Sequence, residues 1–81
     1  MKVPILVATP NEGFGELISQ IIHDSGGYSI TLVKNGADAM KQMKIHAPAL
    51  CIVDAALEDI QILDLTHQIR AIEKDVFLIV I

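Results

Sequence analysis

A single carboxylate, Asp54, stands where this sequence is best placed to do chemistry. It follows Ala-Leu-Cys-Ile-Val, residues 49–53, which is apolar throughout. A short run of this kind is typical of a strand that is buried on both faces of a parallel sheet. A carboxylate at the end of such a strand is either a reactive group or a structural residue that bonds nearby backbone. These residues alone leave both interpretations open.

The other residue types that do chemistry lie at spacings that argue against a site. The three histidines fall in different predicted elements and do not have the spacing of metal ligands. They are His23, His46 and His67. Cys51 lies in mid-strand, which favours a buried small hydrophobe. Gly13 and Gly15 form a G-x-G pattern, a weak indication of a phosphate loop on its own. We therefore predict neither an enzyme nor a resident metal or cofactor.

Apolar runs and helical spacings alternate along the chain and predict the order β-α-β-α-β-α-β. The strands are expected at residues 3–8, 28–33, 49–53 and 76–81. Between the strands, three segments repeat apolar residues at helical spacing and are predicted helices. Asn11 and Asn35 are the predicted N-caps of the first two helices, and the third helix covers residues 62–72. Such alternation predicts a parallel α/β sheet with right-handed crossovers. The partial alternation at 28–33 suits a sheet edge.

Composition favours one small domain. The chain has 81 residues, of which 52% are hydrophobic, and its formal net charge is −4. This length suits one domain, residues 1–81. The acidic balance gives no support for binding nucleic acid, and no apolar run approaches the roughly 18 residues of a membrane span. One cysteine cannot form an internal disulfide, so we expect a cytoplasmic protein.

The last predicted strand lacks a cover. Residues 76–81 are all large and apolar, and no helix follows to pack against them. Such a strand exposes an edge and a face to water. We therefore expect either a domain that is incomplete at its C-terminus or a second copy that supplies the missing cover, with a homodimer as the preferred outcome.

Four motifs in order resemble the receiver domain of two-component response regulators. They are ILVATPNE at 5–12, NGADAM at 35–40, HAPALCIVD at 46–54 and DVFLIVI at 75–81. The resemblance implies a flavodoxin-like sheet in the order 2-1-3-4, truncated before the fifth strand and covering about two-thirds of the family's domain. In such sheets, sites lie at the carboxyl ends of strands where the strand order switches.

The resemblance gives Asp54 the position of the residue that accepts a phosphoryl group from a histidine kinase. That reaction uses Mg²⁺, which prefers oxygen ligands that include carboxylates. The family supplies them from an acidic pair after the first strand, and that pair falls here on Thr9 and Pro10. Neither is a carboxylate, so we expect no metal, or at most weak Mg²⁺ binding at Asp54.

Other family positions also differ in this sequence. The hydroxyl residue that closes the family's fourth strand falls on Val80. After the acceptor, the family's usual Pro falls on Glu58, and its Asp-Gly pair falls on residues 61–62. Glu12 is either a substitute Mg²⁺ ligand or an acid favoured by a helix N-terminus. Glu58 and Asp59 either add negative charge beside Asp54, which would hinder an anionic phosphodonor, or serve as loop and helix-start acids.

Three functions follow from the resemblance. The preferred one is a degenerate receiver-like signalling module of a phosphorelay, which acts through contacts with a histidine kinase, an output domain or a second copy. The second is a receiver that is phosphorylated on Asp54, and it alone requires Mg²⁺. The third is a truncated fragment with only structural or assembly behaviour.

Overall fold

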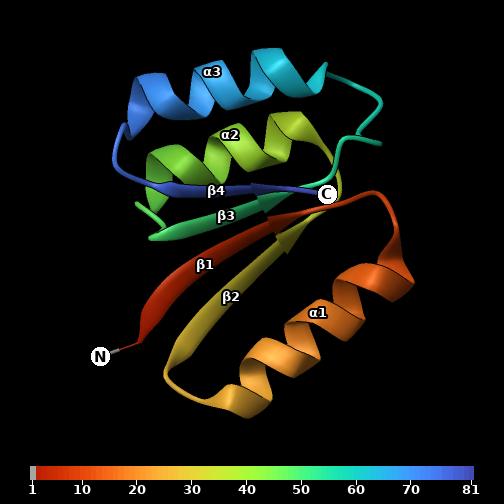
Figure 1. The fold of residues 1–81 in the computed structure, drawn as a ribbon, viewed down its shortest axis with the longest axis vertical. Coiled ribbons are helices and arrows are strands. Elements are labelled where there is room, and N and C mark those ends of the chain that lie inside the picture. Colours follow the sequence, from red (N-terminus) through yellow and green to blue (C-terminus); the bar gives the residue numbers. More distant parts are fainter. Residues whose placement is uncertain (1) are drawn as a thin grey trace.

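Four strands and three helices alternate in the computed structural model, which describes residues 2–81 (Figure 1). They are β1 (Val3–Ala8), α1 (Glu12–Ser25), β2 (Tyr28–Val33), α2 (Gly36–Ile45), β3 (Leu50–Val53), α3 (Ile62–Ile72) and β4 (Phe77–Val80). The predicted order is confirmed. The ends of the last two strands were placed one residue too far out, because residues 49, 76 and 81 only flank the paired segments.

The strands form one parallel sheet in the order β2-β1-β3-β4, as the resemblance implied. β1 therefore lies between β2 and β3, and β2 forms the predicted edge. Ala8 at the end of β1 is in register with Val53 at the end of β3. The residues that follow these two strands consequently emerge side by side at the carboxyl end of the sheet.

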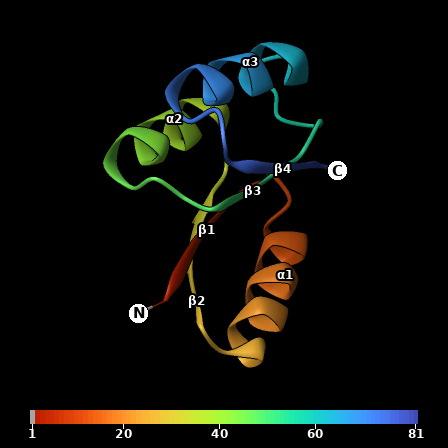
Figure 2. The same cartoon turned by 60° about the vertical axis from the view of Figure 1, so that its left-hand side comes forward.

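The helices cover the two faces of the sheet unequally. α2 and α3 pack on one face, and α1 alone packs on the other (Figures 1 and 2). The larger core lies under α2 and α3 and includes Leu6, Val53, Leu65 and Ile69. A smaller cluster of Ile5, Val7 and Ile52 packs against Ile18 and Ile22 of α1.

Asparagine caps begin the first two helices, as predicted. The Asn11 side chain accepts a hydrogen bond from the Phe14 N–H at 2.9 Å, and Asn35 accepts one from the Asp38 N–H at 2.7 Å. These bonds satisfy backbone donors that have no partner within the helix. α1 ends at Gly26 and Gly27, whose φ angles of 72° and 79° lie in the left-handed region that favours glycine.

β4 is the most exposed strand, as expected from its sequence. Phe77 is 76% exposed, and Ile79 and Val80 are each about half exposed. Within residues 2–81, β4 is paired with β3 on one side and has no strand on the other. None of the helices in this part of the chain is long and apolar enough to cross a membrane.

Candidate functional site at the ends of β1 and β3

Thr9 and Asp54 meet where β1 and β3 end. The Asp54 N–H donates to the Ala8 carbonyl at 2.9 Å, and the Thr9 N–H donates to the Val33 carbonyl at 3.0 Å. These bonds continue the ladder by one residue on each strand. The switch in strand order therefore brings Thr9 and Asp54 to the place where sheets of this type hold their sites.

The Thr9 hydroxyl bonds directly to the Asp54 carboxylate. Thr9 Oγ1 donates to Asp54 Oδ2 at 2.7 Å, and the same oxygen accepts the Asn11 N–H at 3.2 Å. Thr9 is buried, with 1% of its surface exposed. A hydrogen bond to an ionised acceptor in such a place is stronger than one between neutral groups. The hydroxyl is therefore held in one orientation, with its O–H directed toward the Asp54 carboxylate.

The second oxygen of Asp54 is also engaged. Asp54 Oδ1 accepts the Ala56 N–H at 2.8 Å, and the Asp54 carbonyl accepts the Leu57 N–H at 3.2 Å. Asp54 thus closes a turn immediately after β3, like many Asp residues in loops. Both carboxylate oxygens have a protein donor, so the structural interpretation of Asp54 has a concrete geometric basis. The sequence analysis did not predict the hydrogen bond from Thr9 to Asp54. The signal that could have indicated it was a hydroxyl residue at the switch in strand order.

Glu12 is held by a cation on the neighbouring strand end. Its carboxylate forms an ion pair with the Lys34 ammonium, and both side chains are exposed. The Lys34 hydrogen bond and charge lower the pKa of Glu12 below its usual value. Glu12 also lies in the first turn of α1, where a negative charge is favourable. These contacts support the helix-start interpretation of Glu12, and the sequence had not indicated Lys34.

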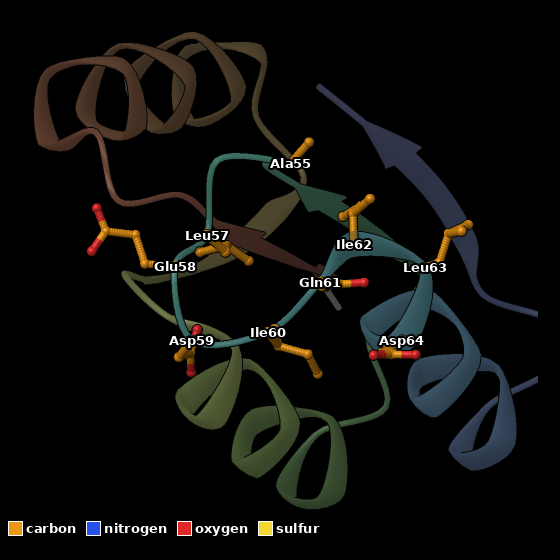
Figure 3. A pocket seen from close by; sticks show the side chains of 9 residues that line it. All are labelled: Ala55, Leu57, Glu58, Asp59, Ile60, Gln61, Ile62, Leu63 and Asp64. Carbon is orange, nitrogen blue, oxygen red and sulfur yellow. The ribbon is translucent and has the colours of Figure 1, made fainter.

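Asp59 caps α2 from the loop that follows β3. Its two carboxylate oxygens accept the N–H groups of Gly36 at 2.8 Å and of Ala37 at 3.0 Å. These two bonds lower the pKa of Asp59. In Figure 3 the Asp59 side chain points to the start of α2, and the loop borders an open hollow with Glu58 at its rim. Asp59 is therefore a helix-start acid, but it serves α2 and not the helix that follows it.

Pro10 and Val80 bring no polar side chain to the ends of the strands. Pro10 is exposed just after Thr9. Val80 pairs in register with Val53 at the end of β4 and is 49% exposed. The Ile81 N–H donates to the Val53 carbonyl, and the Ala55 N–H donates to the Ile81 carbonyl. This side of the site is therefore closed by backbone hydrogen bonds.

The residues present do not fit the Mg²⁺ ion that the resemblance implies. Within residues 2–81, no group of three or more His, Cys, Asp or Glu side chains could hold a metal ion. At the ends of β1 and β3, the side chains of residues 9, 10 and 54 offer a single carboxylate, whose oxygens bond to Thr9 and Ala56. A hard cation requires several oxygen ligands in a fixed geometry.

Cys51 and the histidines lie as expected. Cys51 is fully buried, and its Sγ lies 3.4 Å from Met43 Sδ. Burial raises the pKa of its thiol to about 11, which the charge of Arg70 only partly offsets. A thiol with such a pKa is inert near neutral pH. All three histidines are exposed on separate elements.

This parallel sheet, with a carboxylate at the switch in strand order, belongs to the doubly wound α/β class. The family model described as the response regulator receiver domain matches residues 5–81. The chain therefore belongs to the response regulator receiver domain family. The comparison with curated proteins found no match.

Solved receiver domains have the same fold. The non-phosphorylated HemR receiver domain from Leptospira biflexa is 26% identical with a TM-score of 0.88, and the match covers 98% of this chain and 63% of that one. The chemotaxis response regulator CheY4 of Vibrio cholerae is 13% identical with a TM-score of 0.91 and coverages of 99% and 68%. The MaeR response regulator bound to beryllium trifluoride is 21% identical with a TM-score of 0.87 and coverages of 98% and 66%. The chain thus spans 63% of the HemR chain.

Proposed function

We propose that this receiver domain signals through protein contacts and does not use a phosphoryl group on Asp54. The observation that carries the proposal is the 2.7 Å hydrogen bond from Thr9 Oγ1 to Asp54 Oδ2. In this bond, one oxygen of the Asp54 carboxylate accepts from the buried, neutral hydroxyl of Thr9. Thr9 stands at the position where the family resemblance implies a metal-binding acid. A phosphodonor is an anion, and a metal ion normally neutralises its charge during transfer.

The chemistry of the remaining side chains supports the same proposal. Glu12 is paired with Lys34, and Asp59 caps α2, so two nearby acids already have cationic or N–H partners. The Ala56 N–H donates a hydrogen bond to the second carboxylate oxygen of Asp54. A metal would have to break these bonds before it gained carboxylate ligands. Under this proposal, the carboxyl ends of β1 and β3 keep one conformation without phosphorylation of Asp54.

The partner of such a domain is a protein of a two-component system, either a histidine kinase or an output domain. The domain itself performs no catalysis and needs no cofactor under this proposal. Its expected location is the cytoplasm. These assignments rest on the family membership of residues 5–81.

Intact-mass spectrometry tests the proposal. The 81-residue protein is incubated with acetyl phosphate and Mg²⁺, and we expect no mass increase of one phosphoryl group. The matched variant carries Thr9→Asp and Pro10→Asp, which restores two carboxylates beside Asp54. We expect this variant to gain a phosphoryl group that Asp54→Ala removes.

A phosphorylated wild-type protein whose modification disappears in Asp54→Ala would overturn the proposal and establish the phospho-acceptor function. Failure of the restored variant to gain the group would show that the acids at residues 9 and 10 do not limit the reaction. That result would remove the physical basis of the proposal. Circular dichroism of each variant confirms that the fold is retained.

A further inference from the structure

The N-cap of α2 belongs to the only asparagine–glycine pair in the sequence. Asn35 is followed by Gly36, whereas the other asparagine, Asn11, is followed by Glu12. Asparagine is a thermolabile residue, and glycine has no Cβ to hinder a reaction at its backbone nitrogen. In such a pair, the asparagine side chain can react with the backbone that follows it.

The reaction exchanges ammonia for water. The backbone nitrogen of Gly36 attacks Cγ of Asn35, a bond forms between these atoms, and the Cγ–Nδ2 bond breaks. The leaving nitrogen takes up the proton that Gly36 has lost and departs as ammonia, so that a succinimide ring remains. Water then opens the ring at either carbonyl. Opening at Cγ gives aspartate, and opening at the backbone carbonyl gives isoaspartate, whose main chain runs through the former side chain.

Asp59 holds the attacking nitrogen away from this reaction. The Gly36 N–H donates to Asp59 Oδ1 at 2.8 Å, and the Ala37 N–H donates to Asp59 Oδ2 at 3.0 Å. Attack requires loss of the Gly36 proton, and the electron pair that remains points along the former N–H bond, toward the carboxylate. A neighbouring negative charge also disfavours an anionic nitrogen. Asp59 therefore opposes both the charge and the direction that the attack requires.

Packing around the pair opposes the rotation that would bring the two atoms together. Gly36 is buried, and Ile60 Cγ2 lies so close that a Cβ on Gly36 would not fit. The Asn35 amide is held as well, because its Oδ1 accepts the Asp38 N–H at 2.7 Å and its Nδ2 donates to Asp38 Oδ2 at 3.2 Å. The ring can close only after the peptide between Asn35 and Gly36 has turned out of these contacts.

We propose that Asn35 is a latent deamidation site, which the side chains of Asp59 and Ile60 shield from attack by Gly36. The shield lies in the loop after β3, so a change that lifts this loop exposes the pair. Isoaspartate would lengthen the main chain at the cap of α2. Aspartate would place a negative charge beside the Asp38 carboxylate, to which the Asn35 amide now donates. Shielding does not depend on whether Asp54 accepts a phosphoryl group.

Peptide mapping by mass spectrometry tests the shield. The protein is incubated at mildly alkaline pH, folded or in urea, and then digested with trypsin, which releases Asn35 in the peptide 35–41. A zero-time sample corrects for reaction during digestion. We expect Asn35 to deamidate at least about tenfold more slowly in the folded protein, because hydrogen bonds to a charged group must break first.

Asp59→Ala should raise the rate in the folded protein about tenfold, toward the rate in urea. Ile60→Ala keeps the carboxylate but removes the packing against Gly36, so it should also raise the rate. Circular dichroism shows whether each variant is folded, and Ile60→Ala carries the test if Asp59→Ala is not. Folded variants that react no faster than wild type would overturn the proposal. A slower Asp59→Ala would do the same, because it would make the carboxylate a base that promotes attack.

Two controls separate local shielding from a general loss of stability. Glu58→Ala removes the neighbouring acid of the same loop, and its rate should equal that of wild type within about twofold. Ile5→Val removes a methyl group from the buried cluster under α1 and weakens the fold away from the shield. Its rate at Asn35 should also stay within about twofold of wild type. If Ile5→Val accelerates the reaction as much as Asp59→Ala, the protection comes from global folding and the proposal is wrong.

Discussion

At the scale of single residues, the proposed function rests on one hydroxyl. Thr9 stands where the resemblance places an acid, and it donates a hydrogen bond to Asp54 from a buried position. An acid there would repel Asp54 unless a cation lay between them. A threonine removes that repulsion and supplies a neutral donor. Under the proposal, the contact between Thr9 and Asp54 is therefore structural.

Thr9→Val tests the strength of this contact. The change preserves the shape of the side chain but leaves Asp54 Oδ2 and the Asn11 N–H without the Thr9 partner. We expect the free energy of unfolding to fall by about 1–3 kcal/mol, as for lost hydrogen bonds to charged groups. Urea denaturation measures it. Thr66→Val on α3, where the hydroxyl bonds only to the Leu63 carbonyl, should change stability by less than about 0.5 kcal/mol. Equal losses in the two variants would contradict the account.

At the scale of elements, the loop after β3 is fastened to the start of α2. Asp59 bonds to Gly36 and Ala37, and a Cβ at Gly36 would meet Ile60 Cγ2 closer than real contacts allow. Two segments separated by more than twenty residues are thus joined by one carboxylate and one close approach. The sequence indicated neither contact, because both depend on how the loop folds back over the helix.

Asp59→Asn should make the stability depend on pH in a defined direction. The N–H groups of Gly36 and Ala37 lower the pKa of Asp59 from its usual 3.8 in the folded protein. The stabilisation is therefore complete above the unfolded pKa and is lost as pH falls through the folded pKa. Urea midpoints of wild type should exceed those of Asp59→Asn above about pH 5 and converge with them in acid. A deficit that persists unchanged in acid, or one shared by Glu58→Gln, would contradict the role of the ionised carboxylate.

Two glycine substitutions separate the close approach from helix propensity. Gly36→Ala should destabilise the protein by about 1–3 kcal/mol, because Ile60 must move aside. Gly13→Ala in the first turn of α1 meets only Asn11 Oδ1 at 3.7 Å and should stabilise by up to about 1 kcal/mol. Thermal or urea unfolding distinguishes them. A neutral or stabilising Gly36→Ala would show that the loop does not press on α2.

The sequence was sufficient for the fold because its local signals agreed with one another. Asn11 and Asn35 both cap helices, and the apolar run before Asp54 forms a buried parallel strand, as expected. The position of Asp54 at the carboxyl end of a central strand followed from the strand order that the resemblance implied. The partners of Thr9, Glu12 and Asp59 did not follow, because they are hydrogen bonds and ion pairs between distant segments with no periodic pattern.

At the scale of the whole molecule, residues 2–81 cover the two faces of the sheet unequally. α1 covers only part of its face, and β4 exposes apolar residues at the end of the sheet (Figure 2).

Titration with Mg²⁺ tests the central claim most directly, because phosphoryl transfer in this family depends on the metal. Backbone amide resonances of residues 9, 54 and 56 report on the bonds among Thr9, Asp54 and Ala56. We predict that Mg²⁺ leaves these resonances of the wild-type protein unchanged and shifts them in the variant with Thr9→Asp and Pro10→Asp. A saturable shift of the wild-type resonances that Asp54→Ala abolishes would contradict the account.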